Sequence, residues 1–195
     1  MTSLVAHELE ADSPHDRIGR AAMELMAEAG WEGVTARGVA ARANFPPALV
    51  RSHYGSGAAL RRATALRALA TVFEPVLVAL LVAPVDRALE LAVEAVDSGD
   101  SENCAVAAVL EATLQAQRDP ELREQLLDMR RELQELLERR LASGARAGIL
   151  RQDLDARGAA LFIAAALAGI GLQRALDPDT SLQPGAAAIV AALRA

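Results

Sequence analysis

Residues 34–56, VTARGVAARANFPPALVRSHYGS, constrain the fold of this chain more than any other stretch. Thr35 is a good helix N-cap, and Val34 and Val39 stand around it at the spacing of a hydrophobic staple. A short helix is therefore predicted from residue 36 to about residue 43. Asn44 tolerates the left-handed conformation and can turn the chain, and Pro47 has the fixed φ that suits the first position of a new helix.

The helix that follows this turn is predicted to have one apolar side. Val50 and Tyr54 are four residues apart, so they share a face and are expected to point into the protein. The opposite face, expected to point outward, consists of Pro47, Ala48, Arg51 and Ser52. Two short helices joined by a tight turn form the arrangement that places one helix in the major groove of DNA.

The charge distribution agrees with this interpretation without requiring it. The 195 residues carry a formal net charge of −6, but residues 16–67 contain eight arginines and four acids, whereas residues 68–195 contain 12 arginines and 19 acids. A basic N-terminal third on an acidic body is typical of a DNA-reading head on a body that does not bind DNA. The alternative is a solvated surface with chance clustering.

The composition argues against several other classes of protein. A single cysteine excludes a disulfide framework and a cysteine metal cluster, and the three histidines, at 7, 15 and 53, come with no nucleophile motif or glycine-rich phosphate loop. We therefore expect no enzyme, no cofactor and no metal. The polar N-terminus does not resemble a signal peptide, which favours a cytoplasmic protein with no membrane contact.

Helical periodicity over the remaining chain predicts an all-α protein. Pro75 is expected to bend or end the helix that begins after Ser56, and segment 76–82 is predicted to be helical because a lone strand would have no partner. Residues 98–100 are expected to form a loop, and Asp119-Pro120-Glu121 to begin a long helix closed by Gly144 and Gly148. The predicted organisation is a flexible tail (1–13), a DNA-binding head (14–74) and a helical body (75–195).

A helix predicted near the C-terminus is apolar on every side. From 159 to 172 there is no charged or polar side chain, and the stretch is too short to span a bilayer. We expect the chain's own core to cover one face of this helix and a second subunit the other. An ordinary buried core helix is the alternative. With the last helix, it provides the candidate dimer residues Phe162, Ala166, Gly169, Leu172, Ile189 and Leu193.

The N-terminal segment resembles the TetR family of bacterial transcriptional regulators. The resemblance rests on AEAGWEGVT (27–35) and VAARANFPPALVRSHYGSGAAL (39–60), with weaker similarity in RDPELREQLL (118–127) and GILRQDLD (148–155). It implies about nine helices, three in a helix-turn-helix head and the rest in a body that binds a ligand and dimerises. It also implies a ligand-responsive regulator, most often a repressor, which binds a near-palindromic operator as a homodimer and is released by a small molecule.

The chain departs from the family pattern in and around the helix-turn-helix segment, and two of the departures affect the expected DNA contacts. Asn44 replaces the usual turn glycine, Pro46 replaces a serine at the recognition-helix cap, and Gly57 replaces a lysine before the next helix. The last two changes remove phosphate contacts. Arg61 and Arg62 are candidates to replace the lost charge. If they do not, DNA binding should be weaker and less sensitive to salt.

The candidate DNA-binding residues are Thr35, Arg37, Arg42, Pro46, Pro47, Ala48, Leu49, Arg51, Ser52, His53 and Tyr54. Arg51 is the candidate for reading a guanine, because arginine pairs with its O6 and N7 atoms, and a phosphate contact is the equal alternative. Leu49 could contact a thymine methyl group or pack inward. Thr35 could bind phosphate or act only as a cap, and the resemblance implies a phosphate-facing His53. Arg37 and Arg42 are expected at phosphates or in solvent.

The body offers candidates for an apolar ligand cavity: Phe73, Cys104, Glu111, Gln115, Met129 and Phe162. The alternative is that these residues only fill the core. The effector itself is unknown but is expected to be largely apolar. A second functional hypothesis is a helical small-molecule-binding or adaptor protein on the same scaffold with weak DNA binding.

Overall fold

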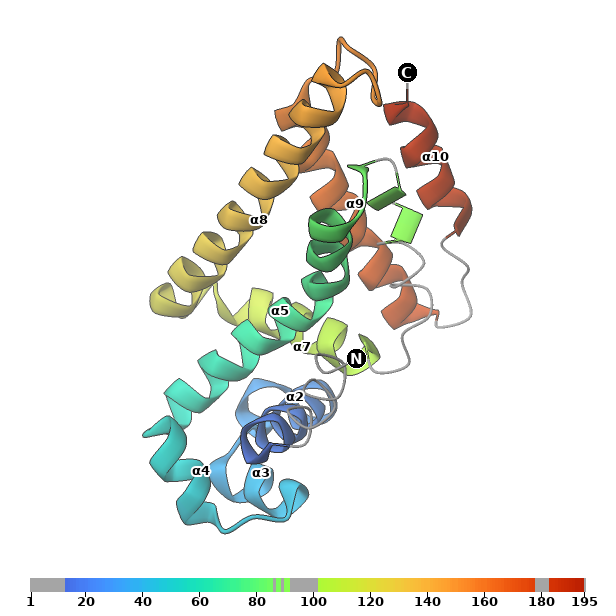
Figure 1. The fold of residues 1–195 in the computed structure, drawn as a ribbon. Coiled ribbons are helices and arrows are strands. Elements are labelled where there is room, and N and C mark those ends of the chain that lie inside the picture. Colours follow the sequence, from blue (N-terminus) through green and yellow to red (C-terminus); the bar gives the residue numbers. More distant parts are fainter. Residues whose placement is uncertain (1–12, 86, 89, 92–101, 178–182, 195) are drawn as a thin grey trace, which may run out of the picture.

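The computed structural model describes residues 13–85, 87–88, 90–91, 102–177 and 183–194, and Figure 1 shows their arrangement. The named elements are all α-helices, which confirms the predicted fold class. Their bounds are α2 (Pro14–Gly33), α3 (Ala36–Ala43), α4 (Pro47–Tyr54), α5 (Gly57–Val82), α7 (Glu102–Gln115), α8 (Pro120–Arg146), α9 (Ala156–Leu176) and α10 (Gln183–Leu193). The predicted tail and the predicted 98–100 loop lie outside the described residues, apart from Ser13, which caps α2.

Helices α2, α3 and α4 form the head at the lower end of Figure 1. Its core consists of apolar residues of all three helices and the start of α5: Ile18, Met26, Trp31, Val34, Val39, Val50 and Leu60. Gly30 has a φ of 70°, so the regular part of α2 ends there and the chain turns toward α3. Val34 and Val39 are both fully buried, as the predicted staple requires.

Helix α5 connects the head to the body. Its N-cap is Ser56, whose side chain accepts a hydrogen bond from the backbone N–H of Ala59, as predicted. The expectation that Pro75 could end this helix is wrong, because α5 continues to Val82. Leu77 and Ala79 in the later turns pack in the core of the body, and the helix continues although Pro75 donates no backbone hydrogen bond. Figure 1 shows α5 changing direction between its two halves, which agrees with a bend.

The head core also contains residues of the body. Ala108 and Ala112 of α7 and Leu122 of α8 belong to the same buried cluster as the head residues. A second cluster further along the chain contains Leu133, Leu137, Leu141, Leu150, Ile163, Val190 and Leu193. The turn between α7 and α8 therefore packs directly beneath the head.

Helix α8 begins as predicted, with Asp119 accepting a hydrogen bond from the backbone N–H of Leu122 and Pro120 at the first helical position. On the exposed side of α8, Glu135 and Arg139 form an ion pair at 3.6 Å, at the i, i+4 spacing that favours such pairs. Gly144 does not close the helix as expected. It lies within α8, where a Cβ atom would stand 2.5 Å from Cγ1 of Val85.

None of the described helices is both long enough and apolar enough to cross a bilayer.

Candidate nucleic-acid interface

The turn between α3 and α4 has the conformation that the sequence predicts. Thr35 caps α3 by accepting a hydrogen bond from the backbone N–H of Gly38 at 3.1 Å. Asn44 ends α3 with φ 59° and ψ 49°, the left-handed conformation. Phe45 then donates its backbone N–H to the carbonyl of Ala40 at 2.9 Å, which closes the turn. These bonds fix the angle between the two helices.

One face of α4 packs on the head and the other is open. Val50 is only 1% exposed, and the side chain of Tyr54 is half-buried, with the pKa of its hydroxyl raised by burial. Of the residues predicted to face outward, Ala48, Arg51 and Ser52 are exposed. Pro47 is only partly exposed. The other exposed residues on this face are Leu49, whose side chain is 39% exposed, and His53.

The start of α4 lacks a side-chain cap. Pro46 is exposed and holds the cap position with an extended backbone, but it offers no side-chain hydrogen bond to the first turn of the helix. The hydroxyl of Ser52 is turned back along α4, donating to the carbonyl of Leu49 at 2.9 Å. The predicted loss of a polar contact at Pro46 therefore has no replacement from Ser52.

The arginines of the head fall into two groups. Arg37 and Arg51 are exposed, and neither has an ion-pair partner among the described residues. Arg42, in contrast, lies 2.5 Å from the carboxylate of Glu28 and 3.8 Å from that of Glu24. Contact between Arg42 and a phosphate would therefore compete with two acids of α2.

Arg61 and Arg62 are also engaged within the protein. Arg61 forms a 3.3 Å pair with Glu32. Arg62 pairs with Asp119 and Glu121 at the start of α8. If these arginines are to replace the charge missing at Gly57, their contact with a phosphate must compete with acids of α2 and α8.

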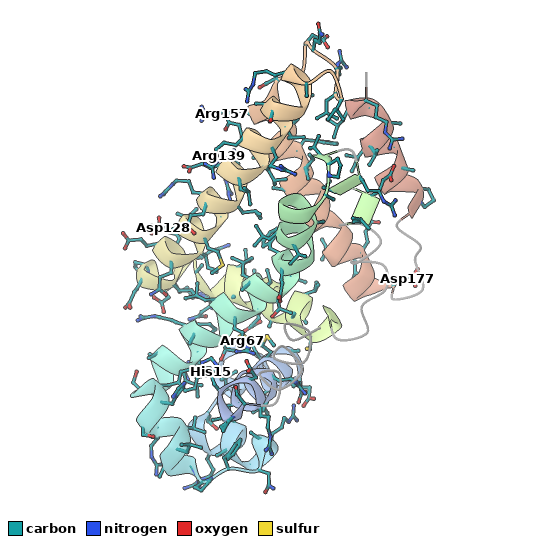
Figure 2. All side chains as sticks on the ribbon, viewed as in Figure 1. His15, Arg67, Asp128, Arg139, Arg157 and Asp177 are labelled. Carbon is teal, nitrogen blue, oxygen red and sulfur yellow. The ribbon has the colours of Figure 1, made fainter. Side chains whose placement is uncertain are left out.

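A cluster of interacting side chains beside α4 was not predicted from the sequence. The rings of His15 and His53 meet edge to face at 4.9 Å between centroids. Arg67 reaches from α5 to the carboxylate of Asp16 at 2.6 Å, passing close to Gly19, where a Cβ atom would collide with it. Figure 2 shows His15 and Arg67 together at this junction. The contact between Arg67 and Asp16 joins residues 51 positions apart, so local patterns could not predict it.

The candidates for a ligand cavity differ in their surroundings. Phe73 packs against the body core, and Cys104, Gln115 and Met129 are half-buried. Burial raises the pKa of the Cys104 thiol. Phe162 is 60% exposed and so cannot line an interior cavity of the single chain. No group of three or more potential metal-ligating side chains occurs in the part of the chain that the structure describes.

Glu111 has a structural contact that the sequence did not indicate. Its carboxylate accepts a hydrogen bond from the backbone N–H of Trp31 at 2.9 Å. This bond joins α7 of the body to the turn that follows Gly30 in the head. Glu111, one of the candidates for the ligand cavity, is therefore bonded to the backbone of the head.

The outward side of α9 carries a large apolar surface. Leu161, Phe162, Leu172 and Leu176 are 50%, 60%, 46% and 79% exposed. Ala166 and Gly169 are partly exposed along the same helix. Two predicted dimer residues lie elsewhere: Leu193 is buried in the body core, and Ile189 packs against that core. The outward face of α10 is formed instead by Ala187, Ala188, Ala191 and Ala192.

Two family models match this chain. Residues 18–64 match the model described as bacterial regulatory proteins, tetR family. Residues 84–195 match the model described as BetI-type transcriptional repressor, C-terminal. None of the curated protein sequences compared with this chain matches it.

Solved structures show the same fold. A TetR-family transcriptional regulator from Cytophaga hutchinsonii superposes with a TM-score of 0.76 at 14% identity, over 95% of this chain and 96% of that one. The fatty acid degradation regulator FadR from Bacillus halodurans gives 0.73 at 17%, over 92% and 100%. A protein from Saccharomonospora viridis, solved in complex with choline, gives 0.71 at 19%, over 89% and 91%. At these identities the similarity concerns the fold alone.

Proposed function

Because the chain belongs to the TetR family of bacterial regulatory proteins, we propose that it is a cytoplasmic repressor, which binds a near-palindromic operator as a homodimer and is released by a small molecule. Membership in this family makes it a DNA-binding transcriptional regulator and not an enzyme. The observation that supports operator binding most directly is the open face of α4. There Arg51 is exposed with no ion-pair partner among the described residues, while Val50 anchors the helix from behind.

In this proposal α4 enters the major groove. Arg51 pairs with a guanine, and Leu49 contacts the methyl group of a thymine. Thr35 and the N-terminal end of α3 face a phosphate, together with Arg37 and His53. Ala48 and the two prolines at the start of α4 let its backbone approach the duplex closely. Few basic side chains are available, so the affinity should be modest and should depend weakly on salt.

The proposed dimer forms through α9 and α10. The apolar side chains on the outer side of α9, Phe162 and Leu172 among them, remain in water in the single chain. Exposed patches of this kind mark interaction surfaces in proteins of this size. The small residues Ala166 and Gly169 would let two copies of α9 pack closely. A symmetric pair then presents two α4 helices to half-sites about one helical turn, or a multiple of it, apart.

The proposed effector is mainly apolar and binds beside Phe73, Cys104, Gln115 and Met129. A neighbour in fold was solved with choline, but a quaternary ammonium group is best bound by several aromatic rings. From residue 68 onward this chain contains only Phe73 and Phe162 as aromatics, and Phe162 is exposed. An aliphatic effector therefore fits this chain better than choline. The effector must prefer one arrangement of the heads in order to release DNA.

The test begins with DNA fragments selected by the protein from a random pool. A homodimeric repressor should enrich a near-palindrome, and gel shifts with that fragment should show binding at low salt. Arg51→Ala should abolish binding, whereas Arg131→Ala, which removes an exposed arginine paired with Asp128 on α8, should not. Absence of any enriched sequence, or equal binding by both variants, would contradict the proposal.

The alternative is a small-molecule-binding or adaptor protein with weak DNA binding. It is favoured by the missing contacts at Pro46 and Gly57, together with the engagement of Arg61 and Arg62 by acids. Under this alternative the activity of the protein does not depend on reading DNA, so Arg51→Ala leaves that activity unchanged.

A further inference from the structure

A partly buried ion pair with two parallel hydrogen bonds joins α5, which carries the head, to the start of α8 in the body. Arg62 of α5 donates from Nε to Oδ2 of Asp119 at 2.8 Å and from Nη2 to Oδ1 at 3.1 Å. Glu121 adds a further acceptor to the same guanidinium. The side chains of Arg62 and Asp119 are only 24% and 15% exposed. A two-bond contact of this kind fixes orientation as well as distance.

Asp119 performs two tasks at once. One oxygen caps α8 by accepting the backbone N–H of Leu122, and both oxygens bind Arg62. Leu122, one turn into α8, is fully buried in the core of the head. The same carboxylate therefore fixes the start of α8 and its position under α5. Consistent with this, hydrogen bonds from Arg62 hold the pKa of Asp119 below its usual range.

A second contact ties the other side of the same turn to the head. Glu111, on α7, accepts the backbone N–H of Trp31 next to Gly30. A Cβ atom at Gly30 would approach the Glu111 carboxylate to 3.3 Å, so the two elements are closely apposed. The end of α7 and the start of α8 therefore each make one polar contact with this region, Glu111 with α2 of the head and Asp119 with α5.

We propose that Arg62 and Asp119 are positioning residues for DNA binding, which set the angle of the head on the body and so the spacing of the two recognition helices. This inference rests on the proposed function. Helix α5 follows α4 directly through the Ser56 cap, so a rotation of α5 carries α4 with it. Loosening the pair leaves each head folded but spreads the distance between heads. The conformational entropy that the two heads then lose on binding DNA lowers the affinity.

Two variants distinguish this positioning role from a direct contact between Arg62 and a phosphate. A phosphate contact is lost in Arg62→Gln but retained in Asp119→Asn, which keeps a good helix cap and removes only the charge. A positioning pair predicts that both variants fail in the same way. It also predicts that the double variant is no worse than Arg62→Gln alone, because Arg62→Gln already removes the pair with Asp119 together with the one with Glu121.

The first experiment measures the affinity of the full-length variants for the DNA fragment selected from the random pool, by fluorescence anisotropy at several salt concentrations. Arg62→Gln and Asp119→Asn should each weaken binding by about tenfold, with the dependence on salt unchanged. Arg131→Gln, at an exposed pair on α8, is the matched control and should bind like the wild type. A salt slope reduced by about 0.9 in Arg62→Gln alone, or additive losses in the double variant, would overturn the inference.

The second experiment does not require DNA binding. Spin labels at Ala41→Cys in α3 and Ser143→Cys in α8, with Cys104→Ser, report the distance between head and body in dimers diluted with unlabelled protein. Both positions are exposed. The distance distribution should broaden in Arg62→Gln and Asp119→Asn but not in Arg131→Gln. Unchanged distributions would refute the positioning role. If the selection finds no DNA while the distributions broaden as expected, the proposed function fails and the positioning of the head stands.

Discussion

The turn at Asn44 allows a sharp test of how the sequence specifies the head. Asn44 is the one non-glycine residue with a positive φ among the described residues, and its side chain is exposed. Substitutions there therefore act mainly through the backbone. The left-handed conformation costs an ordinary L-residue about 1–2 kcal/mol, and asparagine has a smaller but nonzero penalty of the same kind. Asn44→Ala should therefore lower the free energy of unfolding by about 1 kcal/mol.

Glycine at the same position should behave differently. It adopts the left-handed conformation freely, but it adds about 0.4–1 kcal/mol of entropy to the unfolded chain. These two effects oppose each other, so Asn44→Gly should lie close to the wild type. Ala41→Gly, at an exposed position inside α3, is the control and should lose about 1 kcal/mol of helix stability.

Calorimetry at one fixed protein concentration measures these differences, because the melting temperature of a dimer depends on concentration. For a chain of this size about 1 kcal/mol corresponds to roughly 2–4 °C. Asn44→Ala and Ala41→Gly should melt lower by that amount, and Asn44→Gly should not. If Asn44→Ala melts with the wild type, or if glycine is as harmful at 44 as at 41, the left-handed turn is not what Asn44 provides.

Three further predictions concern the body. Leu172→Asp should convert the proposed dimer to monomers in analytical ultracentrifugation. Leu127→Asp, at an equally exposed leucine of α8, is the control and should leave the dimer intact. A dimer in both variants would place the interface elsewhere. Gly144→Ala should lower the free energy of unfolding in urea by about 1–3 kcal/mol, because the added methyl group meets Val85 and Leu150. Gly57→Ala is the control and should leave this free energy unchanged, because only an Arg61 nitrogen lies near, at 4.0 Å. Equal stabilities of the two variants would show that α8 can shift to make room. The pKa of Asp119 is held low by Arg62, so its contribution is complete above the unfolded value of about 3.9 and is lost as pH falls through the folded value. The difference in urea midpoint between wild type and Asp119→Asn should therefore stay constant from pH 8 to 5 and shrink below about pH 4, and a difference that instead disappears near neutral pH would implicate another group.

The sequence by itself determined the local features of the head and the starts of the helices. Thr35, Ser56 and Asp119 cap helices where predicted, and Asn44 turns the chain as predicted. Each of these signals acts over three or four residues, through one hydrogen bond or one pair of dihedral angles. Such signals can be read without knowing the rest of the fold, which is also why the resemblance to the family was clearest there.

Only the tertiary structure decided which charged and apolar groups remain available to a partner. Arg42, Arg51 and Arg62 are equivalent as letters, yet only Arg51 has no acid beside it in the described part of the chain, because α2 and α8 bring Glu28 and Asp119 to the other two. Helix packing likewise buries Leu193 and leaves Leu172 exposed. Pairing across 14 to 57 positions depends on how helices pack, and no local spacing encodes it.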